Sequence, residues 1–381
     1  MIAVTRAATV LLRTVDAPSR NVGAHHGYFR SLVNTFEKAQ GLTTFHNSCD
    51  CAVVSRTTFD LLVVGDANPD VIVSGSPRHP EFGQREQLVP AAGLVLGGSG
   101  AITAYGAARL GLRTAFAGRV GDDPAGTFVL DALRSGGVDV SACVVDPAVP
   151  TAMTVVLVDG DDRAILTAAG CLDRLAATDV PPALLERAAH VHVSSYFLQP
   201  LLAQGLAGLF GMARAAGAST SLDTNDDPAG RWAGLADVLP VTDVLLPNEN
   251  EAFAIARAVS DAGAGAGTGM DVTLGGADRD DADLERAVKE LAAHGTLPVV
   301  KRGAHGALAF ADGELIEVPA RPATVVDAVG AGDSFNAGLL AALLRGLPLS
   351  RSMSVAVTCG TLSTRAAGGT AAQPTWEEAT S

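Results

Sequence analysis

Short apolar runs alternate with longer alanine-rich or amphipathic segments along most of the chain. Residues 59–66 form one such run, which ends in Gly-Asp and is typical of a buried parallel strand. Residues 99–111 are rich in small side chains and predict a helix. A second helix is predicted over 123–137, because Asp123 and Pro124 are suited to the N-cap and the first helical position.

The same alternation continues to the C-terminal end of the sequence. It predicts an α/β protein with a doubly wound, mostly parallel sheet and helices on both faces. Further strands are predicted at 114–121, 188–195, 219–225, 241–248 and 297–303, and further helices at 201–217, 249–259, 284–295 and 332–346.

Two stretches interrupt the alternation with extended segments that have no helix between them. They run from about residue 71 to 96 and from 152 to 168, and Asp159-Gly160 in the second is a hairpin signal. Ligands of doubly wound sheets bind at the carboxyl ends of the strands. We therefore predict that these segments form a small β-strand lid over that edge.

Charge and composition narrow the classes of partner. The chain has 381 residues and a formal net charge of −14, with 48% hydrophobic residues, which is ample for a buried core. An acidic chain without a basic cluster is repelled by nucleic acid and by anionic membrane surfaces. The expected partner is a small molecule, with no nucleic acid and no membrane.

The cysteines and the N-terminal segment favour a cytoplasmic protein. Five cysteines are an odd number and are mostly scattered, which argues against a disulfide framework and for a reducing compartment. The N-terminal apolar run of six residues is too short for a signal sequence or a membrane span. Residues 1–57 have no sustained periodicity and are interpreted as a poorly ordered extension before a domain that covers 58–381.

The most informative motif is the glycine-rich turn within residues 325–338, VVDAVGAGDSFNAG. The chain contains no Gly-Lys pair, which excludes a P-loop, and Phe335 occupies the place of the third glycine in a dinucleotide fingerprint. Because an apolar helix follows, the turn presents free backbone amides at the positive end of the helix dipole, which is an anion site. Asp333 could simply cap that helix, but beside Gly-Ala-Gly it is better explained as a base that takes a proton from a hydroxyl.

The sequence DAVGAGDSF resembles the C-terminal signature of the ribokinase-like (PfkB) carbohydrate kinases, and further motifs follow in the family's order from about Phe59 to the end. The resemblance implies a ribokinase-like fold and an enzyme that uses ATP and Mg²⁺ to phosphorylate an alcohol group. It also implies that Asp333 is the general base, and that the amides of Gly330, Ala331 and Gly332 form the anion hole.

On the acceptor side, the resemblance implies that Asn68 and Asp70 bind sugar hydroxyls, although Asn-Pro-Asp alone is also a turn-forming sequence. Gly97 and Gly98 resemble the Gly-Gly motif at the lid hinge and substrate floor. Two positions nearby depart from the family pattern, namely Ile102, where Asn is usual, and Ser99, where Lys is frequent in ribokinases and phosphofructokinases.

On the nucleotide side, the resemblance implies that Asn248 and Glu251 organise Mg²⁺, water and the nucleotide phosphates. Lys301, Gly303 and Gly306 look like the strand-turn that binds ATP.

Three further positions are predicted with less specific support. Asp327 matches a position that helps to bind a monovalent cation such as K⁺ in many members of the family. Asp223 and Asn225 follow a predicted strand and would face the same cleft.

Two other functions remain open from the sequence. A nucleoside kinase of the same family would need an aromatic acceptor pocket, and aromatic residues make up only 4% of the chain, which favours a sugar. A sugar- or nucleotide-binding protein without turnover is opposed by the complete Gly-Ala-Gly-Asp motif.

The resemblance to the family also implies a homodimer that forms through the lid strands.

Overall fold

A computed structural model of the protein describes residues 57–160, 162–263 and 280–381. The predicted N-terminal extension lies outside the described residues except for Thr57, and the division into an extension and a kinase domain stays a prediction.

An eight-stranded sheet forms the centre of the molecule, in the strand order β14-β13-β12-β11-β10-β9-β1-β4. The six strands from β12 to β4 in this order pair in parallel. Strands β13 and β14 add an antiparallel edge beside β12. The strands are β1 (Leu61–Val64), β4 (Thr114–Ala117), β9 (His190–Ser194), β10 (Ser219–Asp223), β11 (Val244–Leu245), β12 (Leu297–Lys301), β13 (Ala307–Ala311) and β14 (Glu314–Val318). The parallel strands are almost wholly buried, as expected for a sheet covered on both faces.

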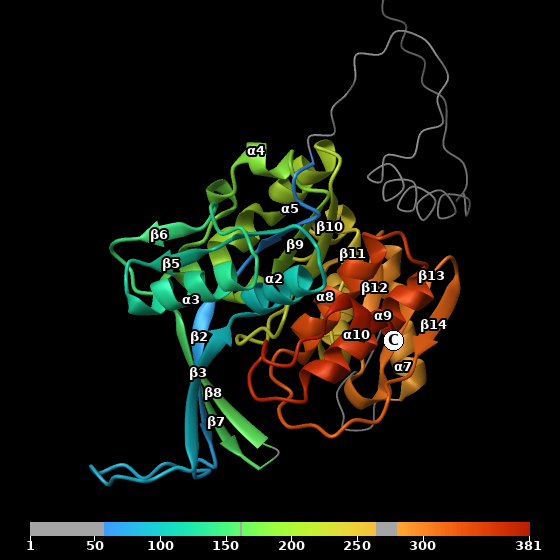
Figure 1. Cartoon of the computed structure of the whole chain (residues 1–381). Coiled ribbons are helices and arrows are strands. Elements are labelled where there is room, and N and C mark those ends of the chain that lie inside the picture. The colour runs from blue at the N-terminus through green and yellow to red at the C-terminus, as the bar shows by residue number, and fades with distance from the viewer. Residues whose placement is uncertain (1–56, 161, 264–279) are drawn as a thin grey trace, which may run out of the picture.

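Helices cover the two faces of this sheet, as predicted (Figure 1). One face packs against α4 (Pro182–Leu185), α5 (Pro200–Ala215), α6 (Glu249–Gly263) and α7 (Asp281–Ala293). The other packs against α2 (Ser99–Arg109), α3 (Pro124–Ser135), α8 (Ala331–Leu343), α9 (Leu349–Ser363) and the short α10 (Trp376–Thr380). As predicted, Asp123 caps α3 by accepting a hydrogen bond of 2.8 Å from the Gly126 amide.

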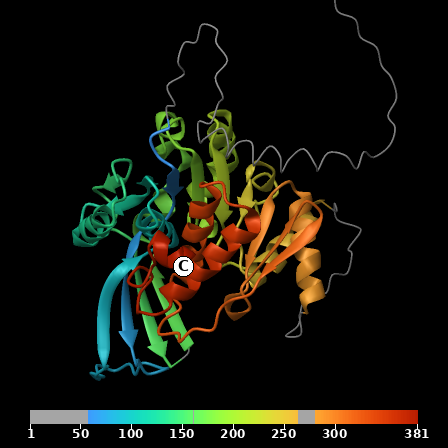
Figure 2. The same cartoon turned by 45° about the vertical axis from the view of Figure 1, so that its right-hand side comes forward.

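A second sheet of four strands projects from this body (Figures 1 and 2), and we call it the lid. Its order is β3-β2-β7-β8, with β2 (Asn68–Ser74), β3 (Ala91–Gly97), β7 (Met153–Asp159) and β8 (Asp162–Ala168). Strand β7 pairs with β8 as an antiparallel hairpin, so the turn signal at Asp159-Gly160 was correct.

The prediction of one strand over residues 114–121 was wrong. The chain divides there into β4 and a separate strand β5 (Arg119–Gly121), which pairs with β6 (Val144–Asp146) in a two-stranded sheet. The break lies at Gly118, where a Cβ atom would come within 2.5 Å of the Phe116 ring and 2.9 Å of the Gly65 carbonyl oxygen. Helix α9 was not predicted from the sequence.

None of the helices in the described part of the chain is both long and apolar enough to cross a membrane.

Candidate active site

The carboxyl ends of neighbouring parallel strands bring together side chains that are far apart in the sequence. Asp66 follows β1, Ser194 ends β9, Asp223 ends β10, Asn248 follows β11 and Lys301 ends β12. This edge of the sheet is where ligands of doubly wound folds bind. The base of the lid and the first turn of α8 meet the same edge.

The glycine-rich turn opens α8 as the sequence predicts. Gly330 precedes the helix with φ 72°, and a Cβ atom there would lie 2.6 Å from the Cα of Gly369, so only glycine fits. Among the described residues, the amides of Gly332 and Asp333 donate to no acceptor. Two free donors at a helix N-terminus can hold an anion.

Asp333 is buried in this first helical turn. The pKa of its carboxyl group is raised well above its usual value, chiefly by burial and then by the negative charge of Asp223. Lys301 and the Ser99 hydroxyl act in the opposite direction but do not outweigh burial. A carboxyl group with a raised pKa is suited to proton transfer near neutral pH.

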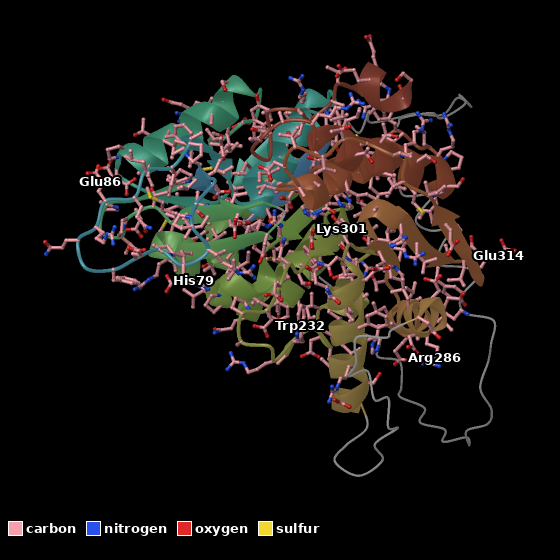
Figure 3. All side chains as sticks on the ribbon, turned by 90° about the horizontal axis from the view of Figure 1, so that it is seen from below. His79, Glu86, Trp232, Arg286, Lys301 and Glu314 are labelled. Atoms are coloured by element: carbon pink, nitrogen blue, oxygen red, sulfur yellow. The ribbon has the colours of Figure 1, made fainter. Side chains whose placement is uncertain are left out.

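Lys301 lies near the middle of the molecule, whereas Arg286 and Glu314 lie at its edge (Figure 3). Its ammonium group donates a short hydrogen bond to the Oδ2 atom of Asp223, which also accepts one of 2.6 Å from the Nδ2 atom of Asn336. Burial alone would lower the pKa of Lys301, but the carboxylates of Asp223 and Glu251 outweigh burial and raise it. Lys301 therefore carries its charge beside the free amides, since a Cβ atom on Gly332 would lie 3.5 Å from its Nζ atom.

Asn248 and Glu251 form a closed pair at the start of α6. The Asn248 amide and its Nδ2 atom donate to the two Glu251 carboxylate oxygens at 2.8 and 2.6 Å, and the Glu251 amide donates to the Asn248 Oδ1 atom at 3.0 Å. Burial, together with the nearby charge of Asp223, raises the pKa of Glu251 to about 7. No group of three or more His, Cys, Asp or Glu side chains placed to hold a metal ion occurs in the described ranges.

A cavity of about 450 Å³ opens beside Lys301 and Gly332. It contains the predicted Gly303 and Gly306, and its remaining wall comes from the segment 320–331 and from α9. Gly306 has φ 95°, and a Cβ atom there would lie 2.0 Å from the Val318 carbonyl oxygen, so this turn also requires glycine. This space is mostly apolar and has the Lys301 ammonium group and the free amide of Gly332 at one end. We call it the nucleotide cavity, after the ATP-binding turn that the sequence predicts at Gly303 and Gly306.

Asn68 and Asp70 lie in β2 at the base of the lid, so the Asn-Pro-Asp sequence is part of a strand and not a turn. The Nδ2 atom of Asn68 donates to the Asp70 carboxylate at 2.7 Å and to the Thr154 hydroxyl at 3.1 Å. Burial, followed by the negative charge of Asp66, raises the pKa of Asp70 to about 7. These groups face the edge that holds Asp333.

Gly97 and Gly98 connect the lid to α2. A Cβ atom on Gly97 would lie 2.1 Å from the Asp70 carboxyl group, and Gly98 has φ 85°. Ser99 begins α2, and its hydroxyl accepts a hydrogen bond of 2.9 Å from the Nδ2 atom of Asn225. The unusual Ile102 is buried against Gly330 and Gly369, so here an apolar contact supports the glycine-rich turn.

Asp327 holds two loops together. Its carboxylate accepts hydrogen bonds from the amides of Val329, at 2.9 Å, and Gly368, at 2.8 Å. Its predicted part in binding a monovalent cation stays a prediction.

Two residues of the site were missed by sequence reasoning. Asp66 accepts hydrogen bonds of 2.9 Å from the amides of Ser99 and Gly100, so it caps α2 from the end of β1. Asn336 lies three residues after Asp333, on the same side of α8, and this spacing could have drawn attention to it. No local signal in the sequence links Asp66 to a helix 33 residues away.

Comparisons of the sequence with known proteins identify its relatives. Residues 58–376 match the pfkB family of carbohydrate kinases. The chain is 33% identical to a fructokinase of Klebsiella pneumoniae over 289 residues, which cover 73% of this chain and 88% of that enzyme. It is 32% identical to a fructokinase of Salmonella typhimurium over 323 residues (82% and 95%), and 28% identical to a nucleoside kinase of Methanothermobacter thermautotrophicus over 316 residues (82% and 85%).

Solved structures with the same fold include an Arabidopsis thaliana ribokinase complexed with ribose and ATP. Its TM-score is 0.69 at 24% identity, over 84% of this chain and 97% of that one. An E. coli protein assigned as a ribokinase II, in complex with ATP and Mg²⁺, has a TM-score of 0.70 at 22% identity with the same coverage. These matches confirm the predicted ribokinase-like fold.

Proposed function

The chain belongs to the pfkB family of carbohydrate kinases, and we propose that it transfers the γ-phosphoryl group of ATP to a hydroxyl group of an unphosphorylated sugar. One observation carries this proposal. A buried carboxyl group with a raised pKa, Asp333, lies in the same helical turn as two free amides and beside the ammonium group of Lys301. Such a turn offers a base for the acceptor and donors for the phosphoryl oxygens.

In the proposed reaction, Asp333 accepts the proton of the acceptor hydroxyl. The hydroxyl oxygen then bonds to the γ-phosphorus while the bond from that phosphorus to the β–γ bridging oxygen breaks, and ADP leaves. The predicted amides of Gly330 and Gly332, with the free amide of Asp333 and the ammonium group of Lys301 beside them, stabilise the charge on the transferring group. The amide of Ala331, also predicted for this role, donates instead to the Ala328 carbonyl oxygen at 3.3 Å. Phosphoryl transfer depends mainly on such positioning and charge stabilisation.

The nucleotide would occupy the cavity between the turn at Gly303–Gly306 and α9. The hydrogen-bond donors of this cavity fit a polyphosphate, because Lys301 and the free amides lie at one end of an otherwise apolar space. Asn248 and Glu251 would orient the waters of the Mg²⁺ ion. Mg²⁺ commonly keeps several waters and binds through one or two carboxylates and the phosphates, so a larger protein cluster is not required.

Electrostatics also support a divalent cation at this site. The negative charges of Asp223 and Asp66 both raise the pKa of Asp333, and the ammonium group of Lys301 opposes them. Mg²⁺ would offset the excess negative charge that otherwise opposes ATP binding. K⁺ at Asp327 remains part of the proposal.

The acceptor sugar would lie between the lid and α2, held by Asn68 and Asp70 above the floor at Gly97 and Gly98. Ser99 is uncharged and so offers no positive charge to a phosphate group on the acceptor, which favours an unphosphorylated sugar. The fructokinase relatives suggest a ketohexose. We further propose a cytoplasmic protein that forms a homodimer through the lid.

The proposal is tested by measuring ADP release with Mg-ATP against hexoses, ketoses, pentoses, sugar phosphates and nucleosides, with Asp333→Asn in parallel. We expect turnover with one unphosphorylated sugar class. Asp333→Asn should reduce kcat by roughly 10²-fold or more, the size of a lost general base, and leave nucleotide binding nearly intact. The phosphorylated product is identified by mass spectrometry.

Three results would contradict the proposal. Near-normal turnover by Asp333→Asn would show that another group is the base. Turnover only with nucleosides would favour the nucleoside-kinase function, and ligand-induced stabilisation without any product would favour a binding protein.

A further inference from the structure

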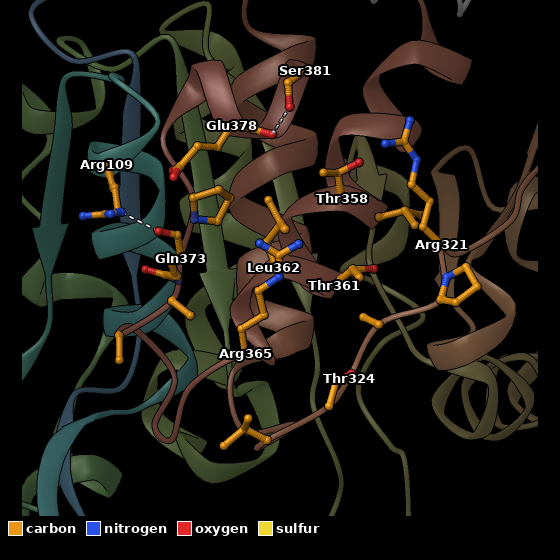
Figure 4. A pocket seen from close by; sticks show the side chains of 17 residues that line it. Arg109, Arg321, Thr324, Thr358, Thr361, Leu362, Arg365, Gln373, Glu378 and Ser381 are labelled. Carbon is orange, nitrogen blue, oxygen red and sulfur yellow. Dashed lines mark hydrogen bonds between the residues drawn. The ribbon is translucent and has the colours of Figure 1, made fainter.

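A second cavity, of about 950 Å³, lies outside the site described above (Figure 4). Its wall comes from the segment 321–326, from the last half of α9, and from the C-terminal segment that contains Gln373 and Glu378. Three arginines line it, namely Arg109, Arg321 and Arg365. We call it the arginine cavity.

The charge of this cavity is opposite to that of the whole chain. The sequence has 41 acidic and 27 basic residues, yet the cavity has three arginines and one acidic side chain, Glu378. That carboxylate accepts hydrogen bonds from the amide and the hydroxyl of Thr375, at 2.7 and 3.0 Å, in a capping box. Arg109 and Arg365 help to lower the pKa of Glu378, after its hydrogen bonds with Thr375.

Two of the three guanidinium groups are available to a ligand. Within the described ranges, Arg321 and Arg365 have neither an ion pair nor a side-chain hydrogen bond, whereas Arg109 donates to the Gln373 carbonyl oxygen. Figure 4 shows Arg365 reaching up the middle of the cavity, with Arg109 and Arg321 on opposite sides. The hydroxyl groups of Thr324 and Thr361 also line the cavity.

The arginine cavity is physically connected to the active site by two routes. Arg321, Pro322 and Thr361 line both this cavity and the nucleotide cavity. In addition, the Nε2 atom of the buried Gln373 donates to the Ser334 hydroxyl at 3.0 Å, and Ser334 directly follows Asp333.

We propose that the arginine cavity binds a small phosphorylated anion with at least two phosphate groups, and that this ligand weakens nucleotide binding. The guanidinium group of arginine can donate two hydrogen bonds to the oxygens of one phosphate, and several arginines around one cavity suit a ligand with more than one phosphate group. Two polyanions that share one wall repel each other and compete for Arg321. The coupling is reciprocal, so ADP must weaken the binding of the anion by the same factor.

The test uses inorganic pyrophosphate as the probe and measures binding by calorimetry, without turnover, so it does not depend on the proposed reaction. Arg365→Gln is the informative variant, because Arg365 lines the arginine cavity and not the nucleotide cavity. We expect it to weaken pyrophosphate binding by about tenfold or more, the loss expected for a charge-assisted hydrogen bond. Arg351→Gln, an exposed arginine on the same helix that lines neither cavity, is the matched control and should bind as the wild type.

A second titration, at constant ionic strength, measures the affinity for ADP at increasing pyrophosphate. We expect a loss of at least about fivefold that reaches a plateau, as a coupling between two sites requires. Unchanged pyrophosphate binding in a folded Arg365→Gln variant would overturn the proposal. So would a loss of ADP affinity without a plateau, because pyrophosphate would then occupy the nucleotide cavity itself.

Discussion

Asp333 shares its surroundings with Asp66, Asp223 and Lys301, and these charges decide its protonation. The carboxyl group is buried among like charges with one ammonium group to oppose them, so its pKa lies well above the usual range. Asp70 and Glu251 are in a similar situation, and both have a pKa of about 7. Three residues to which the sequence analysis assigns a role are thus among the groups whose charged form the fold disfavours, as is frequent at functional sites.

The raised pKa of Asp333 predicts an acid limb in the pH dependence of turnover. The base acts only when it is deprotonated, so kcat should fall as the pH decreases through a pKa above the ordinary value of 3.8. The measurement is kcat at saturating Mg-ATP and sugar between pH 4.5 and 9. The residual activity of Asp333→Asn should lack this limb, and a rate that stays constant down to pH 4.5 would contradict the assignment.

The raised pKa of Asp70 predicts a change in stability with pH. The folded state keeps the Asp70 proton between about pH 4 and 7 while the unfolded chain releases it, so the free energy of unfolding falls as the pH rises through this window. Asp70→Asn removes this contribution. The free energy of unfolding of the variant minus that of the wild type should therefore be roughly 2–4 kcal/mol larger at pH 8 than at pH 4.

Urea unfolding of both proteins at the two pH values measures this difference. Asp131→Asn, at an exposed position of α3, is the control and should follow the wild type. An equal pH dependence in Asp70→Asn and the wild type would show that the Asp70 carboxyl is not perturbed.

At the scale of single elements, the junction between β3 and α2 determines the position of the substrate-facing groups. Gly97 pairs with Asn68 across the two strands of the lid, and the Asp70 carboxyl fills the space that a Gly97 side chain would need. The close approach of strand and carboxyl group is what requires glycine here, and the positive φ of Gly98 requires it at the next position.

Gly97→Ala is therefore expected to displace the Asp70 carboxyl group. KM for the sugar should rise by about tenfold or more, as expected when a hydrogen bond to a charged group is lost, while KM for ATP changes little. Gly93→Ala, in the same strand, is the matched control, because no atom lies within 4 Å of a Cβ atom there. Steady-state kinetics measure both variants, and an unchanged KM for the sugar in Gly97→Ala would contradict this account.

At the scale of the whole molecule, the lid leaves one apolar face uncovered. Leu94, Val71, Val155 and Leu166 pair in register across its four strands, and Leu94 and Leu166 are 52% and 60% exposed. The opposite face contains Asp70 and Thr154 and points to the active site. A sheet with one solvent-exposed face usually presents polar side chains on that face, so an apolar outer face suits a second copy of the chain.

We expect the protein to sediment as a homodimer, and Leu166→Glu to shift it to the monomer. Burial of a charged side chain in an apolar interface without a partner is strongly unfavourable. Leu201→Glu, at a 43% exposed position of α5, should leave the dimer intact. Sedimentation velocity at micromolar protein concentration measures the oligomeric state of the wild type and of both variants. A monomeric wild type would refute the dimer.

Much of the fold could be predicted from the sequence. The strands of a parallel sheet that is buried on both faces must be apolar, so they are visible as apolar runs between helical segments. The glycine-rich turn at 330–332 and Asp333 were predicted for a similar reason, since a strained turn and a helix N-terminus need particular residues in consecutive positions. Gly118 was missed as a strand break because one of the contacts that require it, with the Gly65 carbonyl oxygen, comes from the end of the neighbouring strand β1.

The sequence by itself therefore determined the family and most of the alternation of strands and helices, and it identified the candidate residues of the site. Only the tertiary structure decided that Asp223, Lys301 and Asn336 form one network, that Asp66 caps α2, and that three arginines surround a separate cavity. The physical reason is that hydrogen bonds, pKa values and cavities depend on distances and burial among residues remote in the chain. A local pattern records which side chains are present, and packing decides which of them meet.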